Sequence, residues 1–329
     1  MKTRLERGKQ NMKILVALPT EKKHRQLLET ACPSGEFVYA EGDYSKENIA
    51  DAEVVIGNLP PDRFAECKKL RFVQLGMAGS DNYRGKVPEG VLLANASGAY
   101  GLAISEHMLG NMLMLMKKLH LYRDNQLEAN WHDEGGVTSV EGARVLVVGL
   151  GDIGGEFAKK CKALGAYTIG IRRTLHDKPE YVDELHTLDM LDALIGTADV
   201  VALALPQSKE SAGLMNETRL REMKKGAILL NVGRGSAIDT DALVKVLDEG
   251  HIMAGVDVTD PEPLPAEHPL WKCKNCLVTP HISGFYHLKQ THDRIIAIAA
   301  RNLNSLVSGG EIGNLVDDKT GYRARENRL

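Results

Sequence analysis

Short apolar runs alternate with helical patterns over the second half of the chain, and this alternation limits the possible folds more than any other feature. Ile153, Phe157, Cys161 and Leu164 share one face of an expected helix that Gly165 can end. Strands that alternate with helices over such a length form βαβ units, so the pattern predicts a parallel, doubly wound α/β sheet. The expected strands are Val145–Val148, Thr168–Ile171, Val200–Leu205, Ile228–Val232, Ile252–Val256 and Leu277–Thr279.

A smaller α/β unit is expected before this region. Ile14–Leu18, Val54–Ile56 and Phe72–Leu75 have the pattern of buried strands, each bounded by Gly, Pro, Asn or Asp. The Met-rich stretch Gly101–Tyr122 is apolar on nearly all sides, which is typical of one long buried helix. A further amphipathic helix is expected over residues 288–306. No Ser/Gly-rich linker separates the units, so we expect that the chain crosses between them more than once.

The composition narrows the functional class. At roughly 150 residues per domain, 329 residues correspond to about two domains. Lys and Arg total 41 against 44 Asp and Glu, a formal charge of −3, which lacks the basic excess of nucleic-acid-binding proteins. The longest apolar window, Ala103–Met116, is too short to cross a bilayer. We therefore expect a protein with no nucleic-acid partner and no membrane partner.

The cysteines favour a reducing compartment. The chain has five, widely scattered, which is not a disulfide framework. Residues 1–11 are basic but are not followed by a cleavable apolar segment, so we expect a solvated leader and a cytoplasmic protein. Cys273 and Cys276 form a C-x-x-C pair, but no second pair lies at ligand spacing, so no metal site is expected. His287 and His292 are expected on or near the surface.

A glycine-rich loop follows the first strand of the regular region. Gly149, Gly151 and Gly154 form a Gly-x-Gly-x-x-Gly sequence between a predicted strand and a predicted helix. The first glycine permits the tight turn, the second lets a pyrophosphate approach the backbone, and the third lets helix and strand pack closely. The phosphates would lie at the positive N-terminus of the helix. This arrangement predicts a dinucleotide site.

The end of the next strand bears on which dinucleotide is bound. An acidic residue is expected there to bind the ribose hydroxyls of NAD(H). This chain has Arg172 and Arg173 instead. An arginine can hold a 2′-phosphate with two hydrogen bonds, whereas an acid would repel it. We expect NADP(H) to be preferred, with NAD(H) as the alternative if Arg172 is merely solvated.

Charged side chains also follow the later strands. Arg234 follows the fourth predicted strand, Asp257 and Glu262 follow the fifth, and His281 follows the sixth. In an open α/β sheet, ligands bind at the carboxyl ends of the strands. Each of these residues alone has an ordinary structural explanation, but together beside a nucleotide loop they indicate a catalytic site.

Several motifs in sequence order resemble those of the D-isomer-specific 2-hydroxyacid dehydrogenases. They are residues 149–154, Asn231-Val-Gly-Arg-Gly-Ser, Gly255-Val-Asp-Val-x-x-Pro-Glu-Pro-Leu264 and Pro280-His-Ile-Ser-Gly284. The resemblance covers nearly the whole chain. It implies a Rossmann cofactor domain at residues 98–285, inserted into a smaller, discontinuous flavodoxin-like substrate domain at residues 1–97 and 286–329. It also implies a homodimer.

The resemblance implies an oxidoreductase that transfers a hydride between NAD(P)H and a small 2-keto acid or D-2-hydroxy acid. Arg234 would bind the carboxylate and polarise the carbonyl, and His281 would be the general acid or base. Glu262 would favour charged His281 and orient its ring, with Asp260 as the competing acid. Formate is disfavoured as a substrate, because formate dehydrogenase-like members carry Gln at the position of Glu262.

The resemblance also implies the remaining contacts. Met77, Ala78 and Gly79 would bind substrate through a small-residue loop, although Gly76-Met77 departs from the family's commoner Ser-Ala-Gly. The expected cofactor contacts are Gly149, Gly151, Asp152, Ile153, Gly154, Arg172, Arg173, Leu205, Pro206, Val232, Gly233, Asp257, His281 and Gly284. Two alternatives stay open: a nucleotide-sensing binding or regulatory protein of the same fold, and a short 3-phosphoglycerate dehydrogenase.

Overall fold

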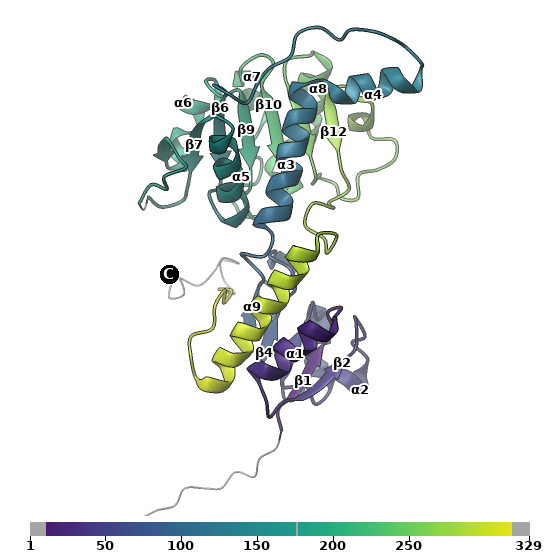
Figure 1. The fold of residues 1–329 in the computed structure, drawn as a ribbon, viewed down its shortest axis with the longest axis vertical. Helices are drawn as coiled ribbons and strands as arrows, with labels where there is room; N and C mark the ends of the chain where they lie inside the picture. Colours follow the sequence, from purple (N-terminus) through teal and green to yellow (C-terminus); the bar gives the residue numbers. More distant parts are fainter. Residues whose placement is uncertain (1–10, 176, 318–329) are drawn as a thin grey trace, which may run out of the picture. The chain divides into compact units, whose positions relative to one another are not determined.

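The computed structural model describes residues 11–175 and 177–317. Residues 1–10 of the expected leader lie outside this range. The chain divides into two compact units (Figure 1). One is formed by the chain up to Ala99 together with the chain from Leu288 onward, and the other is Tyr100–His287.

The first unit contains a five-stranded parallel sheet in the order β2-β1-β3-β4-β5, which is the flavodoxin-like order. The three strands expected from the sequence are present. The pattern missed β2 and β5, because β2 is a partly exposed edge strand and β5 begins at the exposed Leu92. The elements of this unit are β1 (Lys13–Val16), α1 (Lys22–Ala31), β2 (Glu36–Tyr39), α2 (Lys46–Ile49), β3 (Val54–Ile56), β4 (Phe72–Gln74), β5 (Leu92–Ala94) and α9 (Lys289–Ser308).

Helix α9 joins this unit by packing on α1. The buried His24 of α1 bonds through Nε2 to Asp293 Oδ1 at 2.7 Å. Hydrogen bonds from Lys23 and His24 lower the pKa of Asp293 to about 2. His292 is half-buried and packs edge-on against His24, whereas His287 is exposed. Within the described residues, no three His, Cys, Asp or Glu side chains are grouped so that they could hold a metal ion.

The second unit contains a seven-stranded parallel sheet in the order β12-β11-β10-β9-β6-β7-β8. This order reverses beside β6 and is the doubly wound arrangement predicted from the sequence. All six expected strands are present. The short edge strand β8 was missed because it has a single apolar residue, Leu185, between Glu184 and His186, and all three are only half-buried. The strands are β6 (Arg144–Val148), β7 (Tyr167–Ile171), β8 (Glu184–His186), β9 (Val200–Leu203), β10 (Ile228–Asn231), β11 (Met253–Val256) and β12 (Cys276–Val278).

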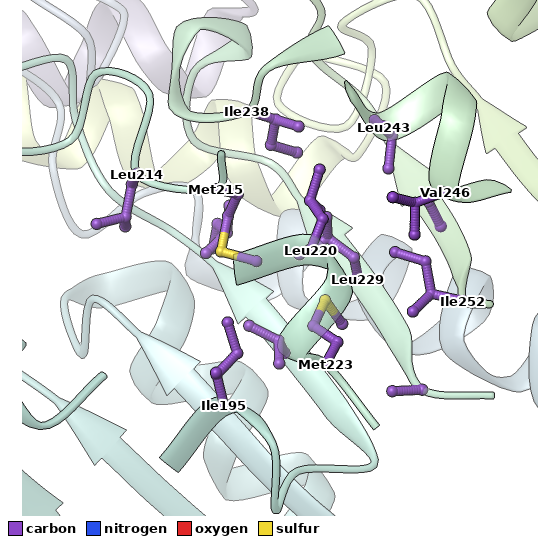
Figure 2. Close-up of a cluster of buried hydrophobic side chains, with 14 of the residues drawn as sticks. Ile195, Leu214, Met215, Leu220, Met223, Leu229, Ile238, Leu243, Val246 and Ile252 are labelled. Carbon is purple, nitrogen blue, oxygen red and sulfur yellow. The ribbon is translucent and has the colours of Figure 1, made fainter. Parts of the chain in front are cut away.

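The helices of this unit cover both faces of the sheet. They are α3 (Gly101–Met116), α4 (Leu119–Leu127), α5 (Asp152–Ala163), α6 (Leu191–Ile195), α7 (Glu217–Glu222) and α8 (Thr240–Asp248). Figure 2 shows part of the apolar core, in which Met215, Leu220 and Val246 lie close to Leu229 of β10. Burial of these side chains holds β10 in its position in the sheet, and the position of β10 determines where the residues that follow it lie.

The prediction of one helix over Gly101–Tyr122 is wrong, because the structure has two helices there. Helix α3 ends at Met116, and Lys118 takes a left-handed φ of 56° before α4 begins at Leu119. Two consecutive lysines interrupt the apolar pattern at this point. Buried Met108 and Met112 face the interior of the unit, as expected for a packed helix. No helix of the described chain is both long and apolar enough to cross a membrane.

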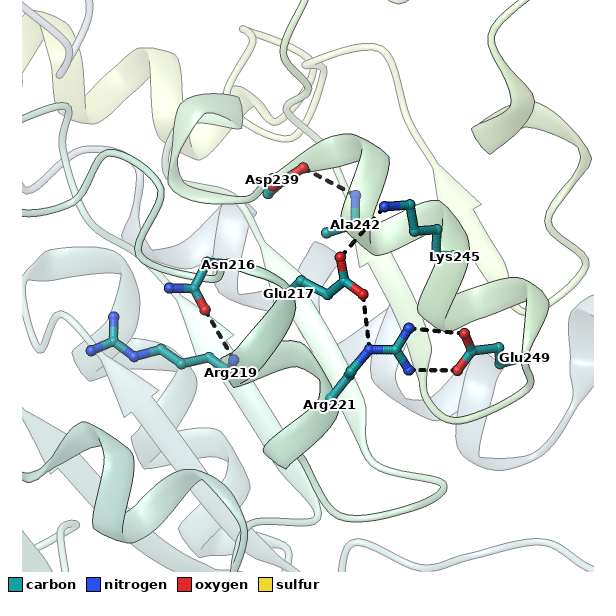
Figure 3. A network of polar contacts seen from close by, with 8 residues as sticks. All are labelled: Asn216, Glu217, Arg219, Arg221, Asp239, Ala242, Lys245 and Glu249. Carbon is teal, nitrogen blue, oxygen red and sulfur yellow. Dashed lines mark hydrogen bonds and ion pairs between the residues drawn. The ribbon is translucent and has the colours of Figure 1, made fainter.

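A network of exposed ion pairs joins α7 to α8 (Figure 3). Arg221 binds both oxygens of Glu249 and contacts Glu217, which also pairs with Lys245. Asn216 and Asp239 cap the two helices by accepting backbone N–H bonds. Exposed pairs contribute little individually, and the caps stabilise the helix starts more directly.

Candidate active site

The glycine-rich loop connects β6 to α5, and its geometry requires glycine. A Cβ on Gly149 would lie 2.6 Å from the Ala204 carbonyl oxygen, and one on Gly154 would lie 2.0 Å from that of Gly149. Gly149 also has a φ of 101°. By contrast, no atom lies within 4 Å of the Cβ position of Gly151. The loop is therefore tight where it packs and open where a pyrophosphate would approach, so a dinucleotide fits it.

Two further residues of this loop were predicted to contact the cofactor. Asp152 is exposed in the first turn of α5, and its Oδ2 accepts the Gly101 N–H at 2.8 Å. Its carboxylate therefore caps the start of α3. Ile153 is half-buried beside it.

Arg172 follows β7 directly and is half-buried. Its Nη2 donates to the carbonyl oxygen of Leu150, within the glycine-rich loop, at 3.3 Å. The guanidinium thus contacts the glycine-rich loop. Arg173 is exposed next to it.

Arg234 lies in a tight turn after β10. The buried Asn231 side chain closes this turn, because its Nδ2 donates to the Arg234 carbonyl oxygen at 2.9 Å and its Oδ1 accepts the Gly233 N–H at 3.0 Å. A Cβ on Gly235 would lie 1.9 Å from the Thr259 carbonyl oxygen, so the turn also packs against the segment that follows β11. The motif contained Asn231, but its positioning role was visible only in the folded chain.

His281 pairs with Glu262. His281 Nδ1 lies 2.5 Å from Glu262 Oε1. Because a carboxylate accepts, Nδ1 carries the proton and Nε2 is left for a bound molecule. Both side chains are partly exposed, at 48% and 41%. Asp260, the competing acid, is joined to Thr240 through its backbone carbonyl oxygen.

Asp257 is 1% exposed, and both of its carboxylate oxygens accept hydrogen bonds from residues around His281. The sequence predicts it as a cofactor contact and assigns no role to the residues that bind it. These are Thr279 and Ser283, with His107 of α3 beyond them.

The other predicted cofactor contacts follow the carboxyl ends of neighbouring strands. Leu205 and Pro206 follow β9, Val232 and Gly233 follow β10, and Gly284 follows β12. A Cβ on Gly233 would lie 2.4 Å from the Leu205 carbonyl oxygen, so these two segments meet. The sheet therefore brings the predicted residues of this unit to one edge.

Met77, Ala78 and Gly79 belong to the first unit, in the loop after β4. The Met77 carbonyl oxygen accepts the Ala96 N–H at 2.9 Å, and the Ala78 carbonyl oxygen accepts from Asn95 Nδ2 at 2.8 Å. The N–H groups of these three residues have no partner among the described residues. The loop is thus held through its carbonyls.

The C-x-x-C pair has the character of buried thiols. Cys273 is buried, Cys276 is half-buried, and both are free. Burial raises the pKa of Cys273 to about 11 and raises that of Cys276 further. Both thiols are therefore protonated near neutral pH, whereas metal binding and thiol exchange need the thiolate.

Known proteins are similar to this chain in sequence. The profile of the D-isomer specific 2-hydroxyacid dehydrogenase, NAD binding domain, matches residues 109–283. A glyoxylate reductase of Thermofilum pendens is 34% identical over 284 residues, 80% of this chain and 80% of that protein. A hydroxypyruvate reductase of Blautia hydrogenotrophica is 30% identical over 279 residues, 80% of this chain and 85% of that protein.

Solved structures agree. The crystal structure of a D-isomer specific 2-hydroxyacid dehydrogenase from Xanthobacter autotrophicus Py2, in complex with NADPH and MES, has a TM-score of 0.80 and 28% identity. The alignment covers 95% of this chain and all of that one. The chain therefore belongs to the D-isomer specific 2-hydroxyacid dehydrogenase family, whose members are NAD(P)-dependent oxidoreductases.

Proposed function

We propose that this enzyme reduces a small 2-keto acid to the D-2-hydroxy acid with NADPH. The observation that carries the proposal is the 2.5 Å pair between His281 and Glu262, at the same sheet edge as the Arg234 turn and the glycine-rich loop. A histidine with one nitrogen held by a carboxylate and the other available is arranged for proton transfer. The names of the two relatives support glyoxylate or hydroxypyruvate as the substrate class.

In the proposed mechanism, a reduced nicotinamide supplies the hydride to the carbonyl carbon. Arg234 binds the substrate carboxylate and draws charge toward the carbonyl oxygen. His281 donates the Nε2 proton to that oxygen, while Glu262 holds Nδ1–H and stabilises the imidazolium form. In the oxidation direction, neutral His281 accepts the hydroxyl proton.

We further propose that the two compact units correspond to a substrate domain at residues 1–97 and 286–329 and a cofactor domain at residues 98–285. The amides of Met77, Ala78 and Gly79 would receive the substrate carboxylate. We also propose a homodimer that buries three exposed apolar side chains: Leu119 and Leu127, at the two ends of α4, and Trp131 after it. With five free cysteines, the chain suits the reducing cytoplasm.

The direct test is an absorbance assay of NADPH and NADH oxidation with glyoxylate, hydroxypyruvate, pyruvate and a branched 2-keto acid. We expect turnover with at least one of the small acids. Oxidation of 3-phosphoglycerate with NAD⁺, without reduction of the small acids, would favour the 3-phosphoglycerate dehydrogenase alternative. Tight cofactor binding without turnover of any acid would favour the nucleotide-sensing alternative.

Arg172→Asp is expected to reverse the cofactor preference. The 2′-phosphate would lose its charge-assisted hydrogen bonds and face a carboxylate, so the KM for NADPH should rise by about 10²-fold, while that for NADH changes little. Steady-state kinetics with both cofactors at saturating 2-keto acid measures this. Arg219→Lys on α7, away from the loop, is the control and should leave both KM values unchanged. Equal effects of Arg172→Asp on both cofactors would show that Arg172 does not contact a 2′-phosphate.

A further inference from the structure

The turn that carries His281 is held almost entirely by one buried carboxylate residue. Three consecutive N–H groups converge on Asp257: that of His281 on its backbone oxygen at 2.8 Å, that of Ile282 on Oδ1 at 3.0 Å and that of Ser283 on Oδ2 at 3.1 Å. The Ser283 hydroxyl adds a bond to Oδ2 at 2.5 Å. Two successive amides, those of Ile282 and Ser283, therefore bind an anion that is itself part of the protein.

This turn needs such support. His281 has a φ of 51°, in the left-handed region that a non-glycine residue adopts only when its surroundings hold it there. Asp257 also begins the segment that leads to Glu262. The same residue therefore ties the segment bearing the histidine to the segment bearing its carboxylate partner.

The orientation of Asp257 is set in turn from a helix distant in sequence. Thr279 Oγ1 donates to Asp257 Oδ1 at 2.6 Å, so the hydroxyl oxygen accepts from His107 Nε2, which lies 3.1 Å away. Asn111 Nδ2, one turn further along α3, also lies 3.1 Å from His107 Nε2; because that nitrogen donates to Thr279, it cannot accept from this amide at the same time. His107 Nε2 itself lies 3.9 Å from Asp257 Oδ1.

We propose that the hydrogen-bonded chain His107–Thr279–Asp257 positions His281 for proton transfer, with Thr279 and His107 as positioning residues that touch neither substrate nor cofactor. The proposal rests on the proposed function for His281. Proton transfer depends on sub-ångström placement, and a shift of about 1 Å can cost 10²-fold in rate. Through this hydrogen-bonded series, a residue of α3, far in sequence from the reacting groups, would influence the catalytic rate.

Thr279→Val tests the proposal, because valine keeps the shape of threonine and removes only the hydroxyl. We expect kcat to fall about tenfold, with the Kd of NADPH, measured by nicotinamide fluorescence, unchanged. Thr279→Ser restores the hydroxyl and should restore kcat. The control is Thr168→Val. Thr168 is a buried threonine of β7 whose hydroxyl donates to the Tyr181 carbonyl oxygen at 2.8 Å and lies 3.1 Å from Asp183 Oδ2, and its loss should leave kcat unchanged.

A second measurement does not depend on turnover. Hydrogen exchange followed by mass spectrometry on the full chain should show the amides of residues 281–283 exchanging about tenfold faster in Thr279→Val, but not in Thr279→Ser or Thr168→Val. At the other end of the hydrogen-bonded series, His107→Phe should speed the exchange of the same amides and lower kcat, both by less than Thr279→Val does. His107→Gln should leave both quantities unchanged, because the glutamine side-chain amide can donate to Thr279 in place of Nε2.

The outcomes separate the two proposals. Unchanged exchange and unchanged kcat in Thr279→Val would overturn the positioning role. A raised NADPH Kd at unchanged kcat would also overturn it, since Asp257 would then act on the cofactor. Faster exchange in a chain that reduces no 2-keto acid would support the positioning of the turn and contradict the proposed function.

Discussion

Replacing His281 with alanine is expected to lower kcat for a 2-keto acid by about 10³-fold while leaving the Kd of NADPH unchanged. The carbonyl oxygen would take on charge as hydride arrives, and the variant has no group to protonate it. In the native chain Glu262 binds His281 Nδ1, and the proposed mechanism gives it only the orientation of that ring. Single-turnover absorbance at saturating NADPH measures the chemical step directly.

A histidine six positions further along supplies the matched control. His287 is exposed and contacts the ring of Phe285, so His287→Ala removes an imidazole of the same segment without touching the pair. It should retain native kcat. Native turnover in His281→Ala would remove the proton-transfer role and with it the proposed mechanism.

Arg234→Lys is expected to reduce kcat/KM for the 2-keto acid by about 10²-fold, although the positive charge is kept. An arginine presents two parallel N–H donors to a carboxylate, whereas a lysine is a single point charge on a flexible stem. Arg234 Nη1 donates to the Gly233 carbonyl oxygen at 2.7 Å, but the Asn231 side chain closes the turn through backbone groups, so we expect the turn to survive the substitution. Initial rates over a range of substrate concentrations measure the loss.

Arg221→Lys is the corresponding control. Arg221 also makes a bidentate pair with a carboxylate, that of Glu249, but this pair is exposed and joins α7 to the end of α8 (Figure 3). Its replacement should leave kcat/KM unchanged. If Arg234→Lys had no larger effect than Arg221→Lys, the substrate carboxylate would have to be bound by other groups.

Sequence reasoning predicted the second unit well because its strands are buried on both faces. Such strands appear as uninterrupted apolar runs, and β6, β9 and β10 are buried along nearly their whole length. The strands that were missed, β2, β5 and β8, lie at sheet edges, where half-exposed residues need no apolar pattern. The end of α3 was missed because apolar residues resume after Lys117 and Lys118, so the left-handed residue at Lys118 was not distinguished from a polar position of a continuing helix.

The sequence by itself determined which residues could meet at the candidate site. Parallel strands end at a common edge, so Arg234, Glu262 and His281 could be assigned to one place from their positions after three strands. Only the tertiary structure decided which groups bond to one another: Glu262, not Asp260, pairs with His281, and Asp257 binds the turn of residues 281–283. A hydrogen bond depends on distances of tenths of an ångström between segments far apart in the chain. His107 and Thr279, 172 positions apart, come within 3.1 Å only because α3 packs against the sheet.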